Sequence, residues 1–212
     1  MFDFDRIIDR KGSDCVKWDM SPPAFQTRPG AAGPGSARQD SAGLLPLWVA
    51  DMDFASPPAV CQAIRERAEH PVYGYALRPE GYLDAFADWM RLRHGAGVER
   101  PWLLSTPGIV AALAATIRAF SREGDGVCIM PPVYHPFARL IRANGRRVEE
   151  APLRDEGGRY AIDLDALDTA ASRSKLLILC SPHNPVGRVW TGAELEAIAE
   201  IEIGRASCRE RV

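Results

Sequence analysis

The chain has 212 residues, of which 46% are apolar, and a formal net charge of −2. This length allows one or two domains with a substantial core. The near-neutral charge, without any run of Lys and Arg, argues against a nucleic-acid-binding surface. No stretch approaches the length of a membrane span, and the residues after Met1 do not resemble a signal peptide. We therefore expect a cytoplasmic protein that binds neither nucleic acid nor membrane.

The five cysteines show no paired spacing of the kind found in metal sites or disulfide frameworks. Cys128 and Cys180 lie in apolar runs, where cysteine behaves as a small hydrophobic residue. Cys180 and His183 could form only half of a metal site, so we expect no metal. These observations favour a reduced intracellular compartment.

The chain is interpreted as three regions. Residues 1–50 form an N-terminal arm and part of a small domain, and residues 28–43, rich in Gly, Pro and Ser, are expected to be a flexible insertion. Residues 51–201 form the first part of a larger domain in which helical and strand patterns alternate. The expected helices cover residues 57–69, 80–94, 108–122, a segment from 136, 164–171 and a segment from 192. The expected strands cover residues 102–105, 127–130, 147–151 and 175–180. This alternation predicts an α/β fold with a mostly parallel sheet.

Local signals support several of these boundaries. Ser56 is expected to cap the helix that starts at Pro57, and Gly95 and Gly124 are expected to stop the next two. Thr191 and Glu194 have the spacing of a capping box. The helix over 80–94 is expected to bury one side, formed by Leu83, Phe86, Trp89 and Met90.

Residues 202–212, with the sequence E-I-G-R-A-S-C-R-E-R-V, match the in-frame translation of a common short-read sequencing adapter. The helix that begins after Thr191 should lead into another buried strand, but it meets this Arg-rich segment instead. We therefore expect residues 202–212 to be a non-native tail and exclude them from reasoning about the fold. The chain is then expected to be the amino-terminal part of a longer protein.

Three loops carry the chemistry. Ser181-Pro-His-Asn-Pro-Val-Gly187 follows an apolar strand, and open α/β sheets bind ligands at such strand ends. Tyr134 sits after another strand, in the proline-rich turn Pro131-Pro-Val-Tyr-His-Pro136, where its ring could stack on a flat cofactor. Thr106-Pro-Gly108 precedes a helix, whose first N–H groups and dipole favour an anion such as phosphate.

With Leu47-Trp-Val-Ala-Asp-Met-Asp-Phe54, these segments occur in the order seen in one enzyme family. Over nearly all of residues 1–201 the chain resembles the cystathionine β-lyase-like (MalY/PatB-type) branch of the fold-type I enzymes that use pyridoxal 5′-phosphate (PLP), next to the class I/II aminotransferases. The resemblance implies an aspartate aminotransferase-like three-layer α/β/α fold, incomplete here, in which residues 51–201 begin the large PLP-binding domain. It also implies a homodimer.

The resemblance assigns cofactor-binding roles to five residues. The backbone of Gly108 and Ile109 would bind the PLP phosphate, Tyr134 would stack on the pyridine ring, and Asn184 would bind O3′, with a cis bond between Asn184 and Pro185. Tyr75 would reach the phosphate of the partner subunit. His183 is interpreted as a neighbour of the site, and the side chains of Asp51 and Asp53 as structural.

The resemblance implies a C–S β-lyase that acts on a sulfur amino acid, cystathionine or a cysteine S-conjugate, and releases a thiol, pyruvate and ammonia. A class I/II aminotransferase is the alternative, because the two activities share most of these motifs. A naturally short, non-catalytic binding domain is a third hypothesis. The only lysines are Lys11, Lys17 and Lys175, and none stands in a Ser/Thr-x-x-Lys loop. We therefore expect the Schiff-base lysine to be absent, the chain to contain no catalytic residue, and the chain to be inactive.

Overall fold

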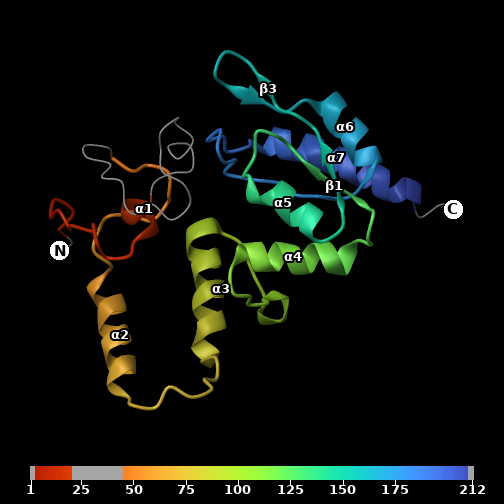
Figure 1. Cartoon of the computed structure of the whole chain (residues 1–212). Coiled ribbons are helices and arrows are strands. Elements are labelled where there is room, and N and C mark those ends of the chain that lie inside the picture. Colours follow the sequence, from red (N-terminus) through yellow and green to blue (C-terminus); the bar gives the residue numbers. More distant parts are fainter. Residues whose placement is uncertain (1–2, 21–44, 210–212) are drawn as a thin grey trace. The chain divides into compact units, whose positions relative to one another are not determined.

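The computed structural model describes residues 3–20 and 45–209 of the chain (Figure 1). The predicted insertion at 28–43 lies outside these residues. The chain divides into two compact units, Met1–Pro79 and Glu80–Val212, which are described separately. The division that we expected after residue 50, and the non-native character of residues 202–212, stay predictions.

Unit 1 contains two described helices, α1 (Val16–Asp19) and α2 (Pro58–Glu69). The predicted end of α2 is confirmed, but the predicted cap is wrong. Pro57 rather than Ser56 occupies the N-cap position, and no side chain caps the helix. Proline is tolerated there because the first N–H groups of a helix lack intrahelical partners in any case.

A polar cluster holds the N-terminal arm of unit 1 to the segment that precedes α2. Arg10 forms ion pairs with Asp51 and with Asp53, the latter at 2.6 Å. Lys17 Nζ lies 2.7 Å from an Asp53 carboxylate oxygen, and Trp18 Nε1 donates to the other at 2.8 Å. Lys17, followed by Trp18, holds the pKa of Asp53 well below its ordinary value. Both carboxylates therefore have partners that suit the structural role we expected.

Unit 2 begins with α3 (Glu80–His94), the 3₁₀ turn η2 (Arg100–Trp102) and α4 (Ile109–Phe120). The strands and helices that follow are β1 (Gly126–Ile129), α5 (Pro136–Ala143), β2 (Arg147–Glu150), β3 (Arg154–Asp155), β4 (Tyr160–Ala161), α6 (Leu164–Ser172), β5 (Ser174–Leu177) and α7 (Gly192–Arg209). Among the described residues, no helix is long and apolar enough to cross a membrane.

The main sheet is parallel, with the order β2-β1-β5, which confirms the predicted sheet and α/β class. The central strand β1 is buried along its whole length. Because successive side chains of a strand point to opposite faces, Val127 and Ile129 pack with Ile117 of α4 and Ile141 of α5. On the other face, Cys128 packs with residues of α6 and α7, which include Leu167 and Ile198. The sheet therefore lies between two layers of helices.

Two expectations about unit 2 are wrong. Residues 102–105 form no strand, because Pro101 lacks an N–H group and the chain closes instead into the 3₁₀ turn, with Leu103 N–H donating to Arg100 O at 3.1 Å. The helix α3 has the predicted bounds but buries none of its residues. Phe86 and Trp89 of its predicted core face are 47% and 56% exposed.

Gly126 of β1 lies in close contact with Glu149 of β2 and with Arg173, which directly precedes β5. A Cβ atom there would lie 2.2 Å from the carbonyl oxygen of Arg173 and 2.8 Å from Cγ of Glu149. Gly126→Ala should therefore lower the free energy of unfolding by about 1–3 kcal/mol, as overpacking does. Urea titration followed by circular dichroism measures this change.

The matched control is Gly81→Ala in helix α3, where an added Cβ has open space. Alanine favours a helix over glycine by about 0.5–1 kcal/mol, so this variant should be neutral or slightly more stable. Equal losses in the two variants would contradict the close approach at Gly126.

Candidate functional site: the carboxyl edge of the parallel sheet

Two loops leave the sheet at the same edge. Strands β1 and β5 are parallel neighbours, so the turn 131–136 after β1 and the loop 181–187 after β5 emerge side by side. His183 Nε2 lies 3.1 Å from the carbonyl oxygen of Pro132, which joins them directly. The bonds Pro131–Pro132, Ser181–Pro182 and Asn184–Pro185 are cis, which confirms the one cis bond that was predicted.

The loop 181–187 is closed at its base and exposed at its tip. His183 N–H donates to Arg188 O at 2.6 Å, and Gly187 N–H donates to His183 O at 2.7 Å. Gly187 has a φ of +70°, which glycine adopts without strain. Asn184 lies at the exposed tip, and no group among the described residues hydrogen-bonds its amide. The amide is therefore available for a ligand, with both donor and acceptor atoms.

Arg188 fixes the far side of this loop. Its guanidinium donates to Tyr160 O at 2.8 Å and pairs with Glu194 at 2.5 Å, and it lies 4.8 Å from the centre of the Trp190 ring. Glu194 accepts from the Thr191 N–H at 2.8 Å, which confirms the predicted capping box. The Thr191 N–H, aided by Arg188, holds the pKa of Glu194 below its ordinary value. The loop is thereby tied to the start of α7.

His183 is buried to 1% exposure beneath the loop. Its ring meets that of Trp190 edge to face, with 5.3 Å between the centres and an interplanar angle of 78°. A carbonyl oxygen only accepts, so the proton must sit on Nε2 to bond Pro132, and Nδ1 is left as an acceptor. Within the described part of the chain, Nδ1 has no partner. Burial lowers the pKa of His183, which favours this neutral form.

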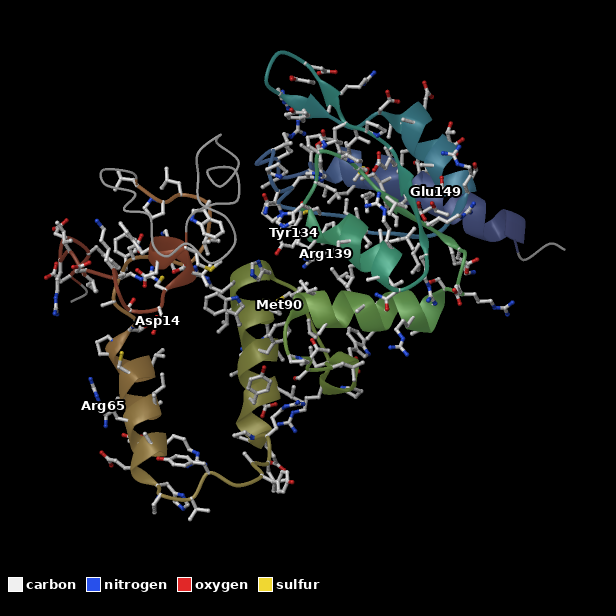
Figure 2. The ribbon with its side chains drawn as sticks, viewed as in Figure 1. Asp14, Arg65, Met90, Tyr134, Arg139 and Glu149 are labelled. Atoms are coloured by element: carbon white, nitrogen blue, oxygen red, sulfur yellow. The ribbon has the colours of Figure 1, made fainter. Side chains whose placement is uncertain are left out.

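Tyr134 lies in the turn after β1, just before α5, as Figure 2 shows. Its ring is half-buried and meets the ring of Phe137 at 84°, with 5.4 Å between the centres. The Tyr134 carbonyl accepts the Phe137 N–H at 3.0 Å, so the backbone is fixed as well. Contacts with the rings of Phe137 and His135 therefore orient the Tyr134 ring, which stays partly exposed.

The start of α4 provides free backbone donors. Gly108 occupies the N-cap position with a φ of +107°, and no side chain caps the helix. The first intrahelical bond is donated by Ala112 to Gly108 O at 3.1 Å, which leaves the N–H groups of Ile109, Val110 and Ala111 without helical partners. Open donors at the positive end of a helix favour an anion.

The connection between α4 and β1 places these donors. Residues 121–125 join the end of α4 to the start of β1, and both elements pack in one core cluster, so α4 runs back along the sheet. A helix of 12 residues spans about 18 Å, longer than the four-residue strand. The N-terminus of α4 therefore lies toward the carboxyl edge, on the side of the sheet where Figure 1 shows the start of α5.

Tyr75 belongs to unit 1, whereas the other four candidates lie in unit 2. Its side chain is fully exposed. Tyr73, by contrast, donates its hydroxyl to Ala68 O. The guanidinium carbon of Arg67 lies 5.2 Å from the centre of the Tyr73 ring. Of the two tyrosines only Tyr75 is free of such contacts within the described residues, and its assigned role stays a prediction.

The candidate residues of unit 2 form an arrangement that can bind a flat anionic molecule. It combines backbone donors at a helix start, an oriented aromatic ring and an exposed amide at one edge of a sheet. In the described part of the chain, no group of three His, Cys, Asp or Glu side chains is placed to hold a metal ion. Sequence reasoning missed the bond from His183 to Pro132, because the two residues are 51 positions apart. The only signal in the sequence was the place of His183 between Pro182 and Asn184, directly after an apolar strand.

Residues 43–202 match the family described as aminotransferase class I and II. The chain belongs to this family. Cystathionine β-lyase PatB of Bacillus subtilis (strain 168) is 39% identical over 200 residues, which cover 93% of this chain and 48% of PatB. The chain thus spans about half the length of the curated relatives that it matches.

Solved structures share the fold, which is of the aspartate aminotransferase type. The PLP-bound C–S lyase of Staphylococcus hominis is similar with a TM-score of 0.80 and 30% identity, over 97% of this chain and 49% of that one. N-succinyldiaminopimelate aminotransferase of Mycobacterium tuberculosis is similar with a TM-score of 0.65 and 30% identity, over 71% of this chain and 40% of that one. Members with lyase names and with aminotransferase names therefore both resemble the chain.

The buried neutral His183 predicts a pH effect on stability. Its pKa is lowered by folding, so between this value and its ordinary value near 6.5 the unfolded chain binds more protons than the folded one. Stability should be fully present above about pH 6.5 and fall as the pH drops toward 5. Chemical denaturation at a series of pH values measures this slope.

The control is His183→Phe, which keeps a ring beside Trp190 and removes the titrating group. The remaining histidines, His70, His94 and His135, are exposed and present in both proteins. The slope between pH 7 and 5 should be smaller in the variant. An equal slope in both proteins would contradict a buried neutral imidazole.

Proposed function

We propose that these residues form the amino-terminal half of a PLP-dependent C–S β-lyase that cleaves cystathionine or a cysteine S-conjugate to a thiol, pyruvate and ammonia. The observation that carries the proposal is the meeting of the turn 131–136 and the loop 181–187 at one sheet edge, joined by His183 and Pro132. Support comes from the likeness to PatB and to the C–S lyase of S. hominis, which match 93% and 97% of this chain at 39% and 30% identity.

The described residues fit PLP in three ways. The N–H groups at the start of α4 suit its phosphate. Gly108 adopts a positive φ there and, as glycine, places no side chain at the start of the helix. The oriented ring of Tyr134 suits the pyridine ring. The free amide of Asn184 can donate to the O3′ oxygen, which an acidic side chain would repel. Tyr75 would reach the phosphate of a second subunit in a homodimer.

When bound, PLP withdraws electrons from the substrate Cα and so makes its proton removable. The residues described here bind and orient the cofactor. We infer that the chain lacks the lysine that bonds to PLP. Lys11 and Lys17 belong to unit 1, where Lys17 pairs with Asp53, and Lys175 lies at the start of β5, at the opposite end of the strand from Asn184. We infer that the chain alone binds the cofactor without catalysing the reaction.

An aminotransferase is the alternative, and the likeness to N-succinyldiaminopimelate aminotransferase supports it. The segment Leu47–Phe54 favours the lyase, because this string is specific to the lyase branch that the chain resembles. Product analysis with cystathionine separates the two activities in a full-length protein that contains this half. Pyruvate and homocysteine are expected, and a keto acid that retains its sulfur would show an aminotransferase.

Binding by the chain itself can be tested with pyridoxamine 5′-phosphate, which has no aldehyde and so cannot react with lysines. The wild-type chain should bind it, as followed by quenching of tryptophan fluorescence. Asn184→Asp places a negative charge beside O3′ and should weaken binding by tenfold or more, which corresponds to about 1.4 kcal/mol or more.

The matched control is Asn144→Asp, which makes the same charge change at the far end of α5, where Asn144 donates to Leu140 O at 2.8 Å. This variant should bind within about twofold of wild type, because α5 begins at the binding edge and ends away from it. Equal weakening in both variants would show an effect of net charge, and an undiminished affinity of Asn184→Asp would exclude Asn184 from the site.

A further inference from the structure

One buried polar group, the imidazole of His183, has no part in the proposed chemistry. His183 is the only residue within the described part of the chain with a buried side-chain nitrogen that lacks a partner. Burying a polar group without a partner is unfavourable, and a hydrophobic side chain would avoid this cost beside Trp190. We therefore look for an interaction of the other ring nitrogen that offsets the unfavourable burial of Nδ1.

The other ring nitrogen makes such an interaction. Nε2 donates to Pro132 O across the gap between the two loops, at 3.1 Å. Asn184 is the next residue after His183, and Tyr134 is two residues after Pro132. This hydrogen bond therefore joins the two loops that carry the side chains proposed to hold the ring and O3′ of the cofactor. The loops are also held by the strands that they follow, β1 and β5. The last backbone hydrogen bond between these strands runs from Ile178 N–H to Cys128 O, before either loop begins.

The remaining contacts of His183 restrict the ring to this bond. Trp190 packs edge to face against it, and Trp190 is itself held by a bond from Nε1 to Cys180 O at 2.9 Å. The backbone of His183 is fixed by its bridge with Arg188. The imidazole therefore cannot rotate toward solvent without breaking the packing beneath the loop.

We propose that His183 is a positioning residue, which sets the distance between Asn184 and Tyr134 through its hydrogen bond to Pro132 and thereby pre-organises the cofactor site. This inference rests on the proposed function, since it concerns how that site is held. The ring touches no cofactor atom in this role and acts through its neighbours. Supporting residues of this kind raise affinity because the ligand does not have to order the loops when it binds.

The test compares three variants of the whole chain. His183→Phe keeps the ring against Trp190 and removes the donor. His183→Gln has an amide that can donate to Pro132 O. Leu167→Val removes one buried methylene group from α6, on the face of the sheet that carries Cys128, and serves as a control for lost stability alone.

Affinity for pyridoxamine 5′-phosphate should fall about tenfold in His183→Phe, recover to within about twofold of wild type in His183→Gln, and stay unchanged in Leu167→Val. Thermal unfolding of each variant verifies that the chain is folded at the temperature of measurement. Wild-type affinity in folded His183→Phe would overturn the proposal, and so would an equal loss in Leu167→Val.

Amide hydrogen exchange without any ligand gives a second readout. Exchange should accelerate in His183→Phe at Val133, Tyr134, Asn184 and Val186 together, and not in Leu167→Val. If the wild-type chain failed to bind pyridoxamine 5′-phosphate, the proposed function would fall, and the exchange data would still decide the coupling. Unchanged exchange in both loops of His183→Phe would overturn it.

Discussion

The parallel pairing of β1 with β5 is the constraint on which the candidate site depends. Parallel strands bring their carboxyl ends to one edge, so residues 51 positions apart in sequence become neighbours there. The pairing requires that β1 be buried on both faces, which it is, and that the strand starts approach closely, which Gly126 allows. The loops add their own chemistry only after this geometry is set.

The helices packed on one face of the sheet place the other candidate binding groups. Ile117 and Ile141 pack against Val127 and Ile129, which holds α4 and α5 on one face. Both helices follow the sheet back from its edge, so the same packing that forms the core also presents the start of α4 and the turn with Tyr134. Hydrophobic burial and ligand placement are here consequences of a single arrangement.

Local signals made much of this predictable. The bounds of α3, the start of α5 at Pro136 and the capping box at Thr191 depend on residues within four positions of one another, and the structure confirms them. The loop 181–187 was predicted for the same reason, because its motif is contiguous. The strand predicted at residues 102–105 was wrong, because a short apolar run has no periodicity that separates a strand from an irregular segment.

The bond from His183 to Pro132 escaped prediction for a different reason. It is a contact between two loops, set by the register of the strands that precede them, and a register of this kind leaves no trace in the spacing of residues. The same holds for the guanidinium of Arg188, which reaches Tyr160 O from another loop. Sequence motifs thus indicated the groups that are proposed to meet a ligand, whereas the groups that hold them in place came only from the fold.

The distribution of buried residues separates the two units physically. All buried apolar side chains among the described residues lie between Ile117 and Ile198, in unit 2. In unit 1, large apolar side chains such as Leu47, Met52 and Ile64 are exposed, and the described contacts are mainly the ion pairs around Asp53. Exposed ion pairs contribute little to stability, so they cannot replace a core.

Unit 1 therefore needs further apolar surface to cover it, and a patch of this kind on a folded protein marks an interface. The matched region of PatB makes up 48% of that protein. Leu47, Met52 and Tyr75 all belong to this exposed surface of unit 1. The groups proposed to hold the ring and O3′ of the cofactor all lie in unit 2, whereas the contribution proposed for Tyr75 comes from the exposed surface of unit 1.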